Sequence, residues 1–182
     1  MAIQTVSRCF VNIQYTAYTN IVSTISGMYR DHLDILVDSL KQLKELRVLK
    51  LSLPEILRDE HLIIIIDNLA HLEDLDVSGL ELNDVVLRSL AKLSNLRNVT
   101  LSGISKFTVD GLLDFVSQLG PSNHGIRVTI DMADPDTLLA EESLAVVREC
   151  LMEKTGGNLE YMALRGMQGY LLNLNFTLTV HV

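Results

Sequence analysis

The sequence predicts an α/β fold in which one strand–turn–helix unit repeats and stacks into a solenoid, with parallel strands on the concave side and helices on the convex side. An aliphatic frame recurs three times in register, in Leu43–Pro54, Leu69–Leu80 and Leu93–Ile104. Within each copy, two aliphatic residues alternate with a polar one at the period of a strand. Between copies, the apolar residues follow the period of a helix, so each copy predicts one strand and one helix.

The three copies share four aligned aliphatic positions and a serine directly after the strand. Their first leucines, Leu43, Leu69 and Leu93, are 26 and then 24 residues apart. This spacing lies within the range of about 20–29 residues that is typical of leucine-rich repeats. The strand residues expected to point inward are Leu49, Leu51, Leu75, Val77, Val99 and Leu101. The helix faces expected to pack on them consist of Leu62, Ile65, Ile66, Leu69, Val86, Leu87, Leu90, Leu112, Phe115, Val116 and Leu119.

Polar residues that can cap free backbone N–H groups mark where three of these helices are expected to begin, at Asp59, Asn83 and Thr108. Residues 32–40 predict a further helix before the first strand, and Ile126–Met132 alternates cleanly enough to predict a fourth strand.

A long helix is expected to open at Asp134–Pro135, because Asp can cap a helix and Pro fits its first turn. Gly156–Gly157 should end it, and Leu159–Leu164 could form a fifth strand. The residues expected on the inner face of this helix are Leu138, Leu144, Val147 and Leu151.

The predicted organisation has three parts. Residues 1–30 lack the repeat frame and form an unassigned N-terminal segment, residues 31–165 form the solenoid, and residues 166–182 form a strand-like tail or cap. Leu172–Val182 alternates strictly, which indicates one strand. Such a strand could cover an edge of the sheet, or it could come from a cut or misread gene end, and both interpretations stay open.

Composition narrows the class of protein. Lys and Arg total 15 against 23 Asp and Glu, so the net charge is −8, and an acidic chain without a basic run does not favour nucleic-acid binding. The longest apolar run, Leu62–Ile66, is far too short to cross a membrane, and no signal peptide is recognisable at the N-terminus. We therefore expect a cytoplasmic or nuclear protein whose two cysteines are thiols.

The repeat frame resembles the leucine-rich-repeat part of fungal F-box/leucine-rich-repeat proteins, which belong to the ribonuclease-inhibitor-like class with long, helical repeats. The resemblance covers residues 32–165. In addition, Gly111–Gly120 followed by Ile126–Met132 and Ala133–Asp136 is similar to the C-terminal part of such proteins. The resemblance implies that an F-box module docks a Skp-type adaptor of a cullin ubiquitin ligase, while the repeats hold the substrate.

The sequence departs from this family in two respects. The residues before the first repeat helix are too few for an F-box, so a Skp-type adaptor is expected only if an F-box is supplied elsewhere. The position after each strand, where many repeats carry an asparagine ladder, holds Pro54, Leu80 and Ile104. Another set of side chains must therefore satisfy the backbone groups that such a ladder would bind.

The residues that flank the inward strand positions are expected to face solvent and a protein partner. None of them is aromatic, so strong binding hot spots are not expected there. The candidate partner-binding residues on the concave face are Lys50, Ser52, Asp74, Asp76, Ser78, Asn98, Thr100, Ser102, Arg127, Thr129 and Asp131.

The sequence favours a non-enzymatic protein, with no catalytic, metal or cofactor site. The five histidines are scattered, and no third partner for a triad accompanies His71 and Asp74. Asp59–His61 reads as a helix-start charge cluster, Glu141–Glu142 as an exposed helix face, and Cys150 as a small buried hydrophobe.

The preferred hypothesis is a protein–protein interaction module, and the resemblance implies that it would be the substrate-binding part of a ubiquitin-ligase receptor. One alternative is a regulator of another enzyme, of the inhibitor or GTPase-activator type. A GTPase activator would need an exposed loop arginine, for which Arg58 and Arg88 are the nearest candidates. Another alternative is a truncated copy without a selected function.

Overall fold

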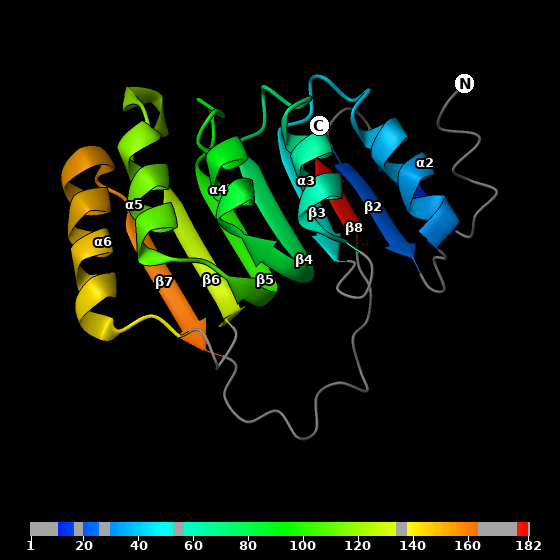
Figure 1. Cartoon of the computed structure of the whole chain (residues 1–182). Coiled ribbons are helices and arrows are strands. Elements are labelled where there is room, and N and C mark those ends of the chain that lie inside the picture. The colour runs from blue at the N-terminus through cyan, green and yellow to red at the C-terminus, as the bar shows by residue number, and fades with distance from the viewer. Residues whose placement is uncertain are drawn as a thin grey trace.

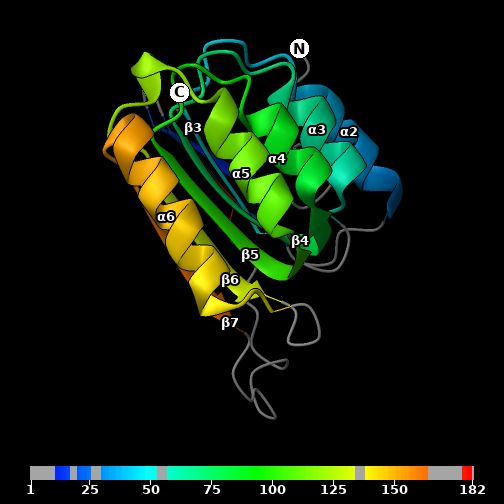
Figure 2. The ribbon, with the colours of Figure 1, turned by 60° about the vertical axis from the view of Figure 1, so that its left-hand side comes forward.

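A computed structural model of the chain describes residues 11–16, 20–25, 30–52, 57–133, 138–163 and 178–181. Their strands form a single eight-stranded sheet, and the helices lie side by side on one of its faces (Figures 1 and 2). The strands are β1 (Val11–Thr16), β2 (Asn20–Ile25), β3 (Val48–Ser52), β4 (Asp74–Asn83), β5 (Asn98–Lys106), β6 (Arg127–Ala133), β7 (Asn158–Ala163) and β8 (Leu178–His181). The α-helices are α2 (Arg30–Leu40), α3 (Asp59–Ile66), α4 (Asp84–Leu90), α5 (Val109–Gln118) and α6 (Glu141–Thr155), and Pro121–Asn123 forms a short 3-10 helix.

The sheet has the strand order β1-β2-β8-β3-β4-β5-β6-β7. Strands β3 to β7 are parallel and follow the chain, with a helix between each consecutive pair, so the predicted mixed α/β class with a parallel sheet is confirmed. The fourth and fifth strands, predicted at Ile126–Met132 and Leu159–Leu164, are β6 and β7. No described helix is both long enough and apolar enough to span a lipid bilayer.

Two buried rows of side chains cross the parallel strands. The first row runs through Leu49, Leu75, Val99, Val128 and Leu159, each in register with the next. All five are buried against the helices. The second row consists of Leu51, Val77, Leu101, Ile130 and the half-buried Tyr161. Full burial of each aliphatic side chain contributes about 1.5–3 kcal/mol, so these rows and the equally buried helix faces dominate the stability of the parallel part.

The three predicted helix starts lie within one residue of the observed ones, and the predicted capping role is confirmed at two of the three positions. The side chain of Asn83 accepts a hydrogen bond from the Val85 N–H at 2.9 Å, and that of Thr108 accepts one from the Gly111 N–H at 2.9 Å. The capping role predicted for Asp59 was wrong, because Arg58 occupies the N-cap position and Asp59 is the first residue of α3. The Asp59 carboxylate instead accepts a hydrogen bond from the backbone N–H of Asn83, in the next unit, at 3.3 Å.

The same link between units recurs one unit later. The carboxylate of Asp84, at the start of α4, accepts hydrogen bonds from the Thr108 N–H at 2.9 Å and the Thr108 hydroxyl at 2.6 Å. A Cβ atom on Gly111 would lie 2.1 Å from the Asp84 side chain, so this helix position has room only for glycine while the link exists. The starts of α4 and α5 are thus each held by a carboxylate of the preceding unit.

Asn123 supplies a second kind of link between neighbouring units. Its side chain is buried, and its amide donates hydrogen bonds to the carbonyl oxygens of Leu93 and Leu96, both at 3.0 Å. Its own amide oxygen accepts a hydrogen bond from the Gly120 N–H at 3.0 Å. One side chain therefore satisfies buried backbone groups in the turn of the preceding unit and in its own loop.

The long helix begins later than predicted. Asp134–Pro135 lies outside the described residues, but residues 138–140 are not helical, and α6 begins at Glu141. Leu138, expected on the inner face, precedes the helix and is 46 % exposed. The pair of acidic residues at 141–142 suits the first turn, where it interacts favourably with the helix dipole. The predicted end is confirmed, because Gly156 adopts the left-handed conformation that terminates α6, with φ 68°.

Segments from both ends of the chain lie at one edge of the sheet. Strand β8 pairs antiparallel with β3 on one side and with β2 on the other (Figure 1). Strand β1 pairs antiparallel with β2. The described part of the predicted tail strand is thus Leu178–His181, next to the first strand of the parallel series. Leu172–Thr177 lies outside the described residues.

Removing the Asp84 carboxylate should loosen the start of α5. We expect Asp84→Ala to lower the free energy of unfolding by about 1 kcal/mol, because the Thr108 N–H loses its partner. Urea denaturation measures this change, with Asp110→Ala, an exposed carboxylate in the first turn of α5, as the matched control. Gly111→Ala should cost less in the Asp84→Ala background than alone, and equal costs in both backgrounds would contradict the link.

Asn123 should be far more sensitive than a neighbouring asparagine. Asn123→Ala removes the side-chain donor to the carbonyl oxygens of Leu93 and Leu96 and the acceptor of the Gly120 N–H, and we expect the free energy of unfolding to fall by about 2–3 kcal/mol. The control is Asn95→Ala, since Asn95 donates a single, longer bond of 3.3 Å to Ala70 at the surface. Thermal or urea denaturation compares the two, and similar losses would show that Asn123 does not hold the turn.

Candidate functional site

The face of the sheet opposite the helices carries the side chains that alternate with the buried rows (Figure 2). We call this surface the open face. The strand register places all the predicted partner-binding residues on it, in three rows that cross the strands. The first row holds Asp74, Asn98 and Arg127, the middle row Lys50, Asp76, Thr100 and Thr129, and the last row Ser52, Ser78, Ser102 and Asp131.

Strand β7 extends the open face further than the sequence analysis proposed. Asn158 is in register with Arg127, Glu160 is in register with Thr129, and Met162 follows on the same strand. All three are exposed. The alternation of Leu159 and Tyr161 with Asn158, Glu160 and Met162 is the sequence signal that places these three residues on the same face.

The first row contains a direct contact between strands. The Asn98 amide donates a hydrogen bond to the Asp74 carboxylate of the neighbouring strand. The Arg127 side chain on the next strand is exposed. Acceptor, donor and cation therefore follow one another across β4, β5 and β6.

Asp76 is the residue of the open face with a perturbed acidity. Burial raises the pKa of its carboxyl group above the usual 3.8, and the Lys50 ammonium group on β3 partly opposes this by lowering the pKa. The rise arises from desolvation, which disfavours the charged form. Lys50 is exposed and lies in register with Asp76, so a cation flanks the carboxylate on one side, while the neutral Thr100 flanks it on the other.

The open face is polar and carries charges of both signs. Exposed side chains there offer cations at Lys50 and Arg127 and an anion at Glu160, and half-buried carboxylates lie between them. Met162, 44 % exposed, supplies one large apolar contact at the β7 end. This chemistry suits hydrogen bonds and ion pairs with a polar surface, spread over several strands.

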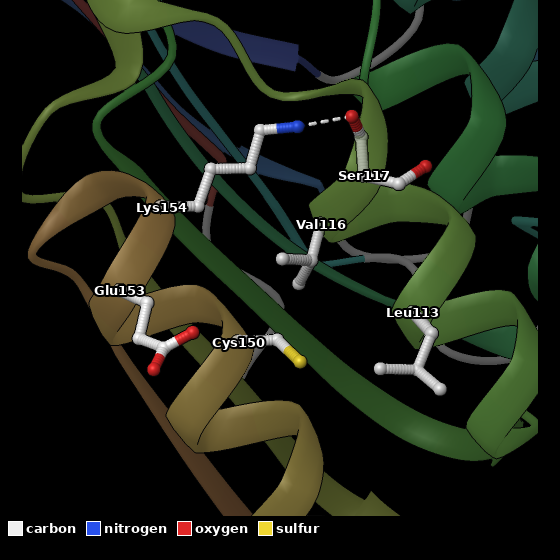
Figure 3. Close-up of a pocket in the computed structure, with 6 residues that line it drawn as sticks. All are labelled: Leu113, Val116, Ser117, Cys150, Glu153 and Lys154. Atoms are coloured by element: carbon white, nitrogen blue, oxygen red, sulfur yellow. Dashed lines mark hydrogen bonds between the residues drawn. The ribbon is translucent and has the colours of Figure 1, made fainter.

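A shallow groove lies between α5 and α6 on the helix side (Figure 3). It is open to solvent, has a volume of about 500 Å³, and is lined by Leu113, Val116, Ser117, Cys150, Glu153 and Lys154. The Lys154 ammonium group donates a hydrogen bond to the Ser117 carbonyl oxygen, which ties the two helices together at one end. Cys150 lines this groove and is only partly buried, so the expectation of a buried cysteine was wrong.

The remaining candidate residues for chemistry are exposed or take part in structural contacts. His61 accepts a hydrogen bond from the Arg58 backbone N–H at 3.3 Å, His71 is exposed, and Glu141 and Glu142 are exposed as predicted. Arg88 forms an ion pair of 3.7 Å with Asp114. Within the described ranges, no group of three or more His, Cys, Asp or Glu side chains is arranged to hold a metal ion.

Comparison with known proteins adds no relative to this description. No protein-family model matches the sequence, and no curated protein matches it significantly.

The acidity of Asp76 should appear in the pH dependence of stability. The pKa of the Asp76 carboxyl group is higher in the folded than in the unfolded chain, so the folded state binds its proton more tightly. The resulting stability is present below pH 3.8 and is lost as the pH rises through the folded pKa. We therefore expect Asp76→Asn to gain stability relative to the wild type as the pH rises from about 3 to about 6. Urea denaturation across this range measures the difference.

The Lys50 cation provides the matched test. As the pH rises, the Asp76 carboxyl group lowers the free energy of unfolding. Lys50→Met should enlarge this loss of stability, because the Lys50 ammonium group opposes the rise in the pKa of Asp76. The control is Lys106→Met, which replaces the exposed lysine at the end of β5 and should leave the pH-dependent loss of stability unchanged. If the difference in the free energy of unfolding between Asp76→Asn and wild type stays constant with pH, the raised pKa assigned to Asp76 is contradicted.

Proposed function

We propose that the chain is a leucine-rich-repeat solenoid of the F-box/leucine-rich-repeat type, and that its open face binds a protein partner without catalysing a reaction. The observation that carries this proposal is the register of the parallel strands, which aligns polar side chains in rows on a face that no described helix covers. A broad face of this kind fits a protein surface, whereas small ligands are usually enclosed in concave pockets.

Two features support a polar protein surface as the partner. The open face mixes cations, anions and hydroxyl groups, which favours specificity and rate of association over raw affinity. The candidate residues also come from several strands of a rigid sheet whose buried rows are continuous, so they are held in fixed relative positions without a binding partner. We infer that binding orders few side chains and that the partner makes many modest contacts.

The resemblance to F-box proteins suggests what the bound partner would be. In that setting, the open face would hold the substrate of a cullin ubiquitin ligase, and an F-box supplied elsewhere would recruit the Skp-type adaptor. The proposed place of action is the cytoplasm or nucleus. Regulation of a GTPase receives no comparable support, because Arg88 is paired with Asp114 and Arg58 also has an interaction partner.

Charge reversal on the open face should abolish partner capture. The test variant is Asp76→Lys combined with Arg127→Glu, and the control is Asp114→Lys combined with Arg88→Glu on the helix side. Both leave the net charge unchanged. We expect tagged wild-type chain and the control to retain the same partner from native cells, and the open-face variant to lose at least about ten-fold in affinity, or about 1.4 kcal/mol. Quantitative mass spectrometry followed by binding measurements on the purified pair checks this.

The possible outcomes separate the alternatives. Co-recovery of a Skp-type adaptor and a cullin would identify a ligase receptor, and recovery of one other protein without them would identify a standalone binder. Equal capture by the open-face variant and the wild type would contradict binding through this face. A chain recovered alone or with chaperones would support the truncated-copy alternative.

A further inference from the structure

The charges of the open face lie on both sides of β5, the middle one of the parallel strands. Within the three rows, β5 contributes the uncharged Asn98, Thr100 and Ser102. Lys106, the charged residue of β5, lies four residues beyond Ser102 and outside the rows. The charges of the rows belong to β3 and β4 on one side of β5 and to β6 and β7 on the other. Strand β5 thus divides the open face into two charged halves.

The two halves match when the open face of a second copy is stacked on the first. A two-fold axis that lies between the two sheets and runs along β5 brings β4 of one copy opposite β6 of the other, and β3 opposite β7. Because the parallel strands are in register, each residue then faces a residue of its own row. A two-fold interface of this kind forms every such contact twice.

Opposite charges face each other in this arrangement. In the middle row, Lys50 lies opposite Glu160 of the second copy, and both side chains are exposed. In the first row, Asp74 lies opposite Arg127 of the second copy. Two kinds of ion pair, each formed twice, can therefore connect the copies.

The remaining carboxylates of the rows meet hydroxyl groups. Asp76 lies opposite Thr129 of the second copy, and Asp131 lies opposite its Ser78. A hydroxyl group can donate a hydrogen bond to a carboxylate. No two side chains of the same charge in the three rows face each other.

Other two-fold arrangements of the same faces bring like charges together. An axis across the strands, along the middle row, would place Lys50, Asp76 and Glu160 each opposite its own copy. An axis along β4 would also place Asp76 opposite its own copy, and an axis along β6 would do the same for Arg127. The distribution of charge therefore favours the axis along β5.

We propose that the open face is self-complementary and that it binds the open face of a second copy of the chain, about a two-fold axis along β5. The inference rests on the proposed function, because it uses the same binding surface, and it names one partner of that surface. The dimer covers the candidate partner-binding residues. Another protein must therefore displace the second copy to reach them.

The dimer is expected to be weak. At about 4.8 Å per strand and about 3.3 Å per residue, the rows from β3 to β7 span roughly 400 Å² of the sheet plane in each copy. This is about half of the roughly 800 Å² that each partner buries in a standard interface. Exposed ion pairs add little each and are screened by salt. Self-association should thus depend strongly on protein and salt concentration.

The test exchanges the charges of one facing pair between two chains. Lys50→Glu alone brings acidic side chains opposite each other, and Glu160→Lys alone does the same with basic ones. We expect each variant to dimerise at least about ten-fold more weakly than the wild type in sedimentation velocity at low salt. An equimolar mixture of the two variants restores opposite charges at both contacts, so a heterodimer should form with nearly wild-type affinity. A loss of folding in the variants cannot produce this restoration.

Salt and a matched pair of variants provide the controls. The wild-type dimer should dissociate as the Debye length falls from about 30 Å in about 0.01 M salt to about 3 Å in about 1 M salt. Arg88→Glu and Asp114→Lys reverse the charges of an ion pair on the helix side. Alone or mixed, these two variants should dimerise as the wild type does. Circular dichroism establishes that each variant is folded.

Two results would overturn the proposal. One is a wild type that stays monomeric at low salt, and the other is a mixture of Lys50→Glu and Glu160→Lys that dimerises no better than its components. Both are obtained with the purified chain alone. They are therefore distinct from failure of the proposed function, which appears as unchanged capture of another protein by the open-face variant.

Discussion

The alignment of the buried aliphatic rows is the constraint on which the rest of the structure depends. Leu49, Leu75, Val99, Val128 and Leu159 lie in register, and a slip of one residue in any strand would turn its apolar side chains to the opposite face. The same register places the polar residues of the open face in rows. Core packing and the candidate binding surface are therefore two results of a single alternation.

The elements that the sequence predicted well are those whose signal is local. Period-2 alternation located β3 to β7, and the capping roles of Asn83 and Thr108 followed from their position directly before an apolar helix face. The buried helix positions were predicted for the same reason. In each case, the residues that decide the structure are close neighbours in the chain.

The features that escaped prediction depend on partners distant in sequence. The Asp84 carboxylate binds backbone and side-chain groups of Thr108, and Asn123 binds carbonyl oxygens in the preceding unit. Neither contact has a local signature in the sequence. The start of α6 was predicted too early. Asp134–Pro135 has the pattern of a helix start, but residues 138–140 are not helical and α6 begins at Glu141. On the open face, the candidate residues themselves could be predicted, but the desolvation of Asp76 depends on packing.

The place of β8 in the sheet has a consequence for the order of folding. Stacked units ordinarily form by local steps, each unit adding to its neighbour. Strand β8, however, pairs with β3 although the two are far apart in the chain, so this edge can be completed only after the intervening units have been synthesised. During translation, the edge of β3 that pairs with β8 lacks this partner until β8 has been synthesised, whereas β4 to β7 can already assemble on the other side of β3. Until β8 has been synthesised, the edges of β2 and β3 that it joins lack this partner, and they are then open to misassociation.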